Sequence, residues 1–130
     1  FFHPEDGIRD CLLSRGLGDV YKRQRYVYAG VFNTERAFTF DGVMQYDNES
    51  GVTSECLHGP NRHGGEAVFA PKIGSVSEDD GYLVCFIHDE AENQSECQII
   101  DAQDITAGPL ARIIKPFRVP YGFHAGWVGA

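Results

Sequence analysis

The chain of 130 residues is acidic, with 19 Asp and Glu against 11 Lys and Arg, and its net charge of −8 argues against nucleic acid as a partner. No apolar run reaches the roughly 20 residues that a membrane-spanning helix needs. The acidic clusters lack the spacing of an EF-hand, so we interpret them as solvated turns.

The first 24 residues have the marks of sequence that does not code for protein. Residues 19–24, DVYKRQ, are the translation of a transposase end sequence used in sequencing libraries, GAT GTG TAT AAG AGA CAG. Residues 6–18 are of the kind found upstream of that tag in assembled metagenomic reads. We therefore expect residues 1–24 to be artefactual or disordered, and we assign the fold to residues 25–130. The alternative is a genuine basic N-terminal arm.

Residues 25–130 show strong β character and no helical period of any length. Residues 38–47 contain an alternating stretch, and residues 47–51 supply the Asn, Ser and Gly of a hairpin turn that leads into a strand at residues 52–57. A short strand is expected at residues 66–70, after two glycines and before Pro71.

The second half predicts four more strands. Residues 82–87, YLVCFI, form an unbroken apolar run after an Asp-Gly turn, which predicts a strand covered on both faces. Residues 97–101 pair most simply with it as an antiparallel partner. Further strands are expected at residues 111–114 and, at the end of the chain, at residues 119–127.

Short strands with turn signals every ten residues or so predict an all-β architecture. About a hundred residues fit one small domain, but they also fit two blades of a β-propeller. A blade buries its faces against neighbouring blades, so an isolated pair would leave a large apolar face in water. The natural parent is therefore expected to be longer.

The histidine of the last expected strand, His124, is bracketed by glycines and lies among the aromatic residues Tyr121, Phe123 and Trp127. These aromatics either pack the core or line a tunnel for a long apolar substrate. Taken alone, one histidine in an apolar strand is more often structural. Glu66, the first residue of its expected strand, could be a strand-edge charge or a partner of Arg62.

The other chemistry-bearing side chains are expected to be structural. His58 and His63 fall in an expected loop and His88 in an expected turn, so none is assigned to a metal. A zinc site built from His58 and His63 is an alternative that lacks a third or fourth ligand. The cysteines at positions 56, 85 and 97 lack paired CxxC spacing, which indicates reduced thiols.

Four motifs carry a family resemblance: GGEAVFAPK at residues 64–72, EDDGYLVCF at 78–86, IIDAQDI at 99–105 and VPYGFHAGW at 119–127. Together they resemble the C-terminal part of the carotenoid cleavage oxygenases, the family that includes the lignostilbene dioxygenases. Members are non-haem iron enzymes on a seven-bladed β-propeller. The resemblance covers nearly all of residues 25–130 and implies that they are C-terminal blades of such a propeller.

The resemblance also implies a site. In the family four histidines bind Fe(II) and three glutamates support them, and the last glutamate and last histidine sit in motifs like those of Glu66 and His124. The spacing here, from 66 to 124, fits. His124 would then be an iron ligand, and Glu66 would hold its other ring nitrogen. The remaining ligands are expected upstream, and no residue of the chain is assigned a catalytic or cofactor-binding role.

The implied parent is an Fe(II) dioxygenase that cleaves a carbon–carbon double bond of a carotenoid, apocarotenoid or stilbene with O2 to give carbonyl products. We expect residues 25–130 alone to be inactive and to bind no stoichiometric iron, because most ligands are missing. The parent is expected in the cytoplasm, with peripheral membrane contact left open. The alternative is a non-enzymatic β-propeller scaffold or binding module, in which Glu66 and His124 form a buried structural pair.

Overall fold

The computed structural model describes residues 24–35 and 39–129. Nearly all of the excluded N-terminal segment, residues 1–23, lies outside the described residues, as does Phe38. The described residues form strands and one short 3-10 helix: β1 Tyr26–Phe32, β2 Phe40–Asp47, β3 Thr53–Leu57, β4 Arg62–Gly64, β5 Val68–Pro71, β6 Gly81–Asp89, β7 Gln94–Asp101, η2 Ile105–Ala107 and β8 Pro109–Ile114. The all-β prediction is confirmed.

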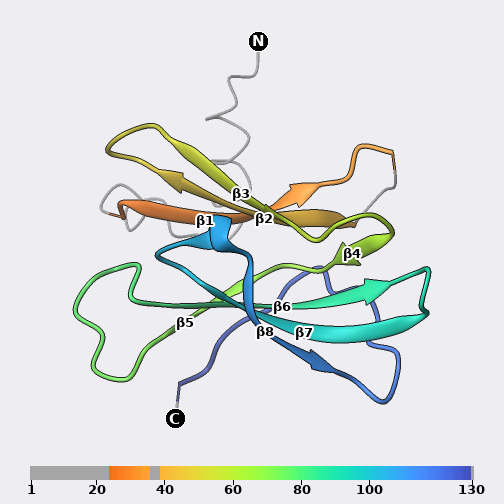
Figure 1. Ribbon diagram of the computed structural model, residues 1–130. Helices are drawn as coiled ribbons and strands as arrows, with labels where there is room; N and C mark the ends of the chain where they lie inside the picture. The colour runs from red at the N-terminus through yellow and green to blue at the C-terminus, as the bar shows by residue number, and fades with distance from the viewer. Residues whose placement is uncertain (1–23, 36–38, 130) are drawn as a thin grey trace.

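All the strands belong to one antiparallel sheet that follows the order β1-β2-β4-β6-β7-β8, with β3 beside β2 and β5 beside β6. Figure 1 shows β1, β2 and β3 as an upper group and β5 to β8 as a lower group. Strand β4 joins the groups, because it pairs with β2 through Phe40 and Gly64 and with β6 through three residue pairs.

The hairpin of β2 and β3 forms where the turn residues predict it. Strands β2 and β3 pair from Gly42 and Leu57 to Tyr46 and Thr53. In the turn, the Gly51 amide donates to the Asp47 carbonyl at 2.8 Å and Gly51 has φ of 71°, a conformation that glycine adopts without steric cost. The expected hairpin is therefore confirmed over the described residues 40–57.

Strands β6 and β7 pair antiparallel over eight residues each, as expected. The prediction that β6 is covered on both faces is wrong. Leu83, Cys85 and Ile87 are buried, but Phe86 between them is 44% exposed. Successive residues of a strand point to opposite faces, so within the described structure only one face of β6 is fully covered.

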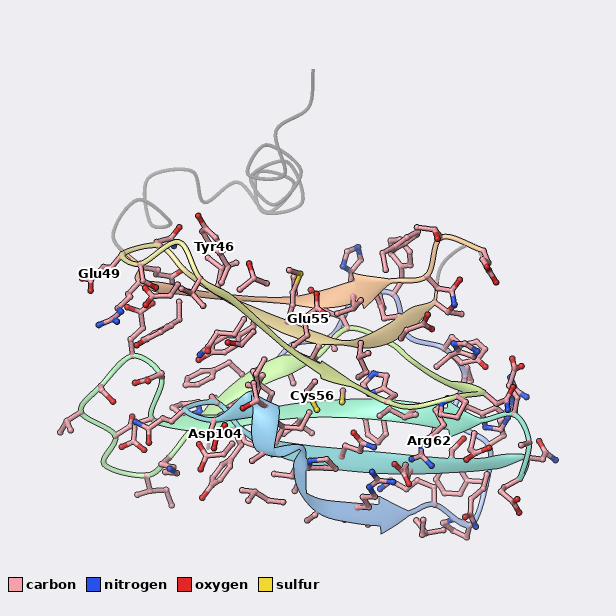
Figure 2. The ribbon with its side chains drawn as sticks, turned by 45° about the horizontal axis from the view of Figure 1, so that its top comes forward. Tyr46, Glu49, Glu55, Cys56, Arg62 and Asp104 are labelled. Carbon is pink, nitrogen blue, oxygen red and sulfur yellow. The ribbon has the colours of Figure 1, made fainter. Side chains whose placement is uncertain are left out.

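The core lies between the two groups of strands. Its buried members come from both groups and from the residues around η2: Val43, Cys56, Leu83, Cys85, Ile87, Ile100, Ala102 and Ile105. Figure 2 shows the Cys56 side chain between the groups. The three described cysteines are buried and form no disulfide, as expected, and burial raises the pKa of the Cys85 thiol to about 12.

The last expected strand is absent from the described structure. Residues 119–127 run past the sheet as irregular chain. Pro120 has no amide to give to a ladder, and two other amides donate to side chains: Val119 to Ser95 Oγ at 2.9 Å and Ala125 to Glu66 Oε2 at 2.9 Å. Side-chain acceptors therefore replace the strand partner that the apolar pattern had predicted.

Two histidines lie in strands where a loop and a turn were expected. His63 is in β4 and His88 is in β6, and the two residues are register partners across these strands. The polar and glycine-rich sequence around residues 58–65 had concealed β4, because only three of its residues pair.

The strand expected at residues 66–70 begins later, at Val68, so that Glu66 lies just before β5. No helix in the described ranges is long and apolar enough to cross a membrane.

His58 is buried at 4% exposure, and neither of its ring nitrogens has a hydrogen-bond partner among the residues that the structure describes. Burial, aided by the positive charge of Arg62, lowers the pKa of His58 to about 4. The folded state therefore favours the neutral form of the His58 imidazole.

The free energy of unfolding should fall as the pH is lowered from 6.5 to 4. In this range the unfolded chain binds a proton at His58 that the folded chain excludes, so acid favours unfolding. At about 1.4 kcal/mol for each pKa unit, the loss attributable to His58 is on the order of 3 kcal/mol. Urea unfolding at several pH values measures it. The His58→Leu variant should lose this slope, whereas His124→Leu, a change at an exposed histidine, should keep it; an unchanged slope in His58→Leu would contradict the assignment.

Candidate functional site

The two residues predicted to form the site, Glu66 and His124, are brought together by a close approach of two backbone segments. Gly65 follows β4, and a Cβ atom there would lie 2.6 Å from the carbonyl oxygen and 3.1 Å from the nitrogen of Gly122. Only glycine fits that approach without a shift of the backbone. The segment that carries His124 is thereby laid against the link between β4 and β5.

The Glu66 carboxylate faces the backbone and the side chain of this segment with the same oxygen. Oε2 accepts a hydrogen bond from the Ala125 amide at 2.9 Å and lies 3.6 Å from His124 Nδ1. The second distance is an electrostatic contact, longer than a normal hydrogen bond. Because Nδ1 is the ring nitrogen that faces the carboxylate, Nε2 is the nitrogen left for a ligand.

Exposure distinguishes the two side chains. That of Glu66 is 26% exposed and that of His124 is 71% exposed. In metal sites a hydrogen bond from the second ring nitrogen to a carboxylate fixes the tautomer of the ligating histidine, and here the carboxylate lies near that nitrogen at 3.6 Å. Within the described residues most of the His124 side chain is open to solvent, and a buried structural pair in the longer parent stays a prediction.

The chemistry of these donors fits one position of an iron site. A neutral imidazole is a common ligand of Fe(II), and a carboxylate behind it raises its basicity. Across residues 24–35 and 39–129, no group of three or more His, Cys, Asp or Glu side chains is arranged to hold a metal ion. The described residues can therefore contribute a ligand to an iron site but cannot build the whole site.

His63 and His88 make structural contacts and lie in strands, whereas His58 lies in the expected loop between β3 and β4. His63 Nδ1 lies 2.7 Å from Asp41 Oδ1, and that carboxylate also accepts two hydrogen bonds from Asn33. His88 Nδ1 contacts Ser95 Oγ at 3.0 Å. The zinc alternative built on His58 and His63 gains no third donor in the part of the chain that the structure describes.

Arg62, which had been a candidate partner of Glu66, binds two other carboxylates. Nη1 donates to Asp89 Oδ2 at 3.1 Å, and Nη2 donates to Glu96 Oε1. Figure 2 shows Arg62 beside β6 and β7, the strands that carry these two acids. Glu96 is buried and also accepts a hydrogen bond from Gln98 Nε2, so Arg62 compensates a buried charge.

The aromatic residues around His124 lie at the surface of the described structure. Phe123 meets the His124 ring edge to face, with centroids 5.1 Å apart, and it is 52% exposed. Trp127 is 54% exposed. These two side chains do not pack the described core, and both sequence interpretations stay predictions for the longer parent.

Sequence reasoning missed the residues that anchor the segment before His124. Arg118 Nη1 lies 3.1 Å from His88 Nε2, and the Tyr121 hydroxyl donates to Glu90 Oε1 at 3.2 Å. The one available signal was the pair Pro116 and Pro120, since two prolines so close together argue against a regular strand.

Comparison with known proteins places the chain in a family. A profile of the family described as retinal pigment epithelial membrane protein, RPE65, matches residues 18–129. The carotenoid 9,10(9',10')-cleavage dioxygenase of Crocus sativus is 37% identical over 125 residues, with 82% of this chain and 22% of that protein covered. The apocarotenoid-15,15'-oxygenase of Synechocystis is 36% identical over 104 residues, with 79% and 21% covered.

Solved structures of apocarotenoid oxygenases also match the chain. A variant of the Synechocystis apocarotenoid oxygenase superposes with a TM-score of 0.74 and 35% identity, and 82% of this chain covers 22% of that one. A cobalt-substituted form of the same enzyme gives the same TM-score, identity and coverage. The match confirms the expected fold, C-terminal blades of a seven-bladed β-propeller.

The chain spans about a fifth of the length of the relatives it matches, 22% of the Crocus and bean dioxygenases. The match nevertheless includes both Glu66 and His124, because the family profile extends over residues 18–129. On the profile, the relatives and the superposed structures together, the chain belongs to the carotenoid cleavage oxygenase family.

Proposed function

We propose that residues 25–130 are the C-terminal blades of a dioxygenase that cleaves a carbon–carbon double bond of a carotenoid or apocarotenoid with O2 to give carbonyl products. The names of the relatives support the reaction and the substrate class. The observation that carries the proposal is the contact of the Glu66 carboxylate with His124 Nδ1 and the Ala125 amide. Stilbene, the other substrate class that the resemblance implies, stays a prediction.

In this proposal His124 is one ligand of an Fe(II) ion and Glu66 is the carboxylate that supports it. The iron, when bound, supplies activation of dioxygen beside the substrate alkene. Glu66 keeps the proton of the imidazole on Nδ1, so that the lone pair of Nε2 is available to the metal. Its hydrogen bond to the Ala125 amide holds the backbone next to the ligand.

In this proposal the chain orients the His124 ring and lines part of the site. Phe123 packs edge to face on the His124 ring and restricts its rotation. Residues 25–130 alone are proposed to be inactive, since the other ligands come from upstream sequence. A cytoplasmic location and peripheral membrane contact of the parent stay predictions, and two relatives are named as chloroplastic proteins.

The experiment that tests the proposal is a long sequencing read across the Gln24/Arg25 junction in the source DNA, continued upstream to the start of the open reading frame. We expect the tag-like segment to be replaced by coding sequence with three further histidines and two further glutamates in strands. An uninterrupted short open reading frame that keeps residues 1–24 would overturn the proposal and would favour the scaffold alternative.

Replacing His124 by Ala in the full-length protein should abolish stoichiometric iron binding, measured by metal analysis after gel filtration. An incomplete ligand set holds Fe(II) poorly, because the ligand count and geometry define the site. His63→Asn, which keeps a donor near Asp41, is the matched control and should retain iron. The isolated 130-residue chain should bind none in the same assay, and a tight one-to-one iron complex of that chain would refute the shared site.

Replacing Glu66 by Gln should weaken iron binding by about 10- to 100-fold, the usual effect of losing a carboxylate behind a metal-bound histidine. The amide side chain still accepts from Ala125 but carries no charge to polarise the imidazole. Competition with a chelator of known affinity measures the change. Glu55→Gln, at an exposed position of β3, is the control and should bind iron as the unmodified protein does; equal affinity in Glu66→Gln would show that Glu66 does not support the ligand.

A further inference from the structure

Ser95 receives both ends of the loop that leads from β8 to the segment with His124. The Lys115 amide donates to the Ser95 carbonyl at 2.8 Å, and the Val119 amide donates to Ser95 Oγ at 2.9 Å. Ser95 is 1% exposed, so both bonds are shielded from water. One residue of β7 therefore closes the loop at residues 115–119, in which Pro116 has no amide to offer.

His88 fixes the orientation of that serine hydroxyl. The two residues are register partners in β6 and β7, and His88 Nδ1 lies 3.0 Å from Ser95 Oγ. Arg118 Nη1 lies 3.1 Å from His88 Nε2, and a guanidinium can only donate, so Nε2 is the acceptor. The neutral ring then carries its proton on Nδ1 and donates it to Ser95.

The Ser95 hydroxyl thus accepts two hydrogen bonds, from His88 and from the Val119 amide. Both of its acceptor lone pairs are used, which leaves little freedom for its rotamer. His88 is 2% exposed, and its ring meets Tyr121 edge to face at 6.2 Å. The charged Arg118 lies over the same tyrosine ring, 5.5 Å from its centroid.

From Val119 the chain has six residues to reach Ala125, and it is held along the way. The Tyr121 hydroxyl donates to Glu90 in the β6–β7 turn, Gly122 abuts Gly65, and Ala125 binds Glu66. The contact at Ser95 sets where the segment begins, and the later contacts hold it on its way to the carboxylate.

We propose that Ser95 and His88 are positioning residues for His124: the paired side chains of β6 and β7 clamp the loop at residues 115–119 and so set the path of the ligand segment. The proposal rests on the proposed role of His124 as an iron ligand for its functional meaning. The clamp itself is a property of the metal-free chain and is measurable without iron.

Amide hydrogen exchange of the metal-free full-length protein tests the clamp. Ser95→Ala removes the acceptor of the Val119 amide, so exchange in residues 119–125 should be faster by roughly three- to tenfold, while amides in β2 and β3 keep their protection. Ser77→Ala, at an exposed position of the loop between β5 and β6, is the control. Unchanged exchange in residues 119–125 of Ser95→Ala would overturn the proposal.

His88 variants separate the clamp from general packing. His88→Asn keeps a donor toward Ser95 and should retain slow exchange at Val119, whereas His88→Leu keeps the bulk without the donor and should resemble Ser95→Ala. Equal exchange in the two variants would overturn the role assigned to the hydrogen bond. These variants also keep the test available if Ser95→Ala does not fold.

Iron affinity of the same full-length variants connects the clamp to the site. We expect Ser95→Ala and His88→Leu to bind iron about tenfold more weakly, with His88→Asn close to the unmodified protein. If exchange rises but iron affinity does not fall, and His124→Ala loses its iron, the positioning role is wrong and the iron proposal stands. If His124→Ala keeps its iron, the iron proposal fails, and with it the positioning role.

Discussion

The antiparallel pairing of β6 with β7 is the interaction on which the rest of the structure depends. Strand β6 also pairs with β4 and with β5, so that the strands before and after Glu66 are fixed by the same strand. The inward residues of the pair supply Leu83, Cys85, Ile87 and Ile100 to the core. At the hairpin end, the same ladder sets His88 opposite Ser95. The core residues, the link that carries Glu66 and the contact at Ser95 therefore all depend on the register of β6 against β7.

Burial of apolar side chains accounts for the sheet, but polar groups determine the course of the last residues. Phe123 and Trp127 are half exposed, and the described contacts that hold the ligand segment are made by Ser95, Glu66 and the close approach at Gly65. A one-residue slip of β7 against β6 would turn Ser95 to the other face of the sheet. The position of His124 is therefore tied to the pairing of strands far from it in sequence.

Much of the fold could be predicted from local sequence, because the signals were local. Residues 47–51 predicted the hairpin of β2 and β3 through turn chemistry, and the apolar run at residues 82–87 predicted β6. Strand β4 was missed because three paired residues give no periodic pattern, and residues 119–127 were expected as a strand because Ser95 and Glu66 were not visible as acceptors. The contact of Glu66 with His124 came from the motif resemblance, since no local pattern links residues so far apart.

The clamp at Ser95 has a consequence for how the sequence can change in length. The loop at residues 115–119 is closed at both ends by one residue, so residues added at its exposed positions 116–118 can bulge into solvent without breaking either amide bond. An insertion between Gly122 and His124 would instead separate the close approach at Gly65 from the imidazole and present a neighbour of His124 to Glu66. The loop at residues 72–80 is closed in a similar way, because the Lys72 amide donates to the Asp80 carbonyl at 3.1 Å, and its exposed Ile73 and Val76 mark it as a second place where added residues would leave the distance between carboxylate and imidazole unchanged.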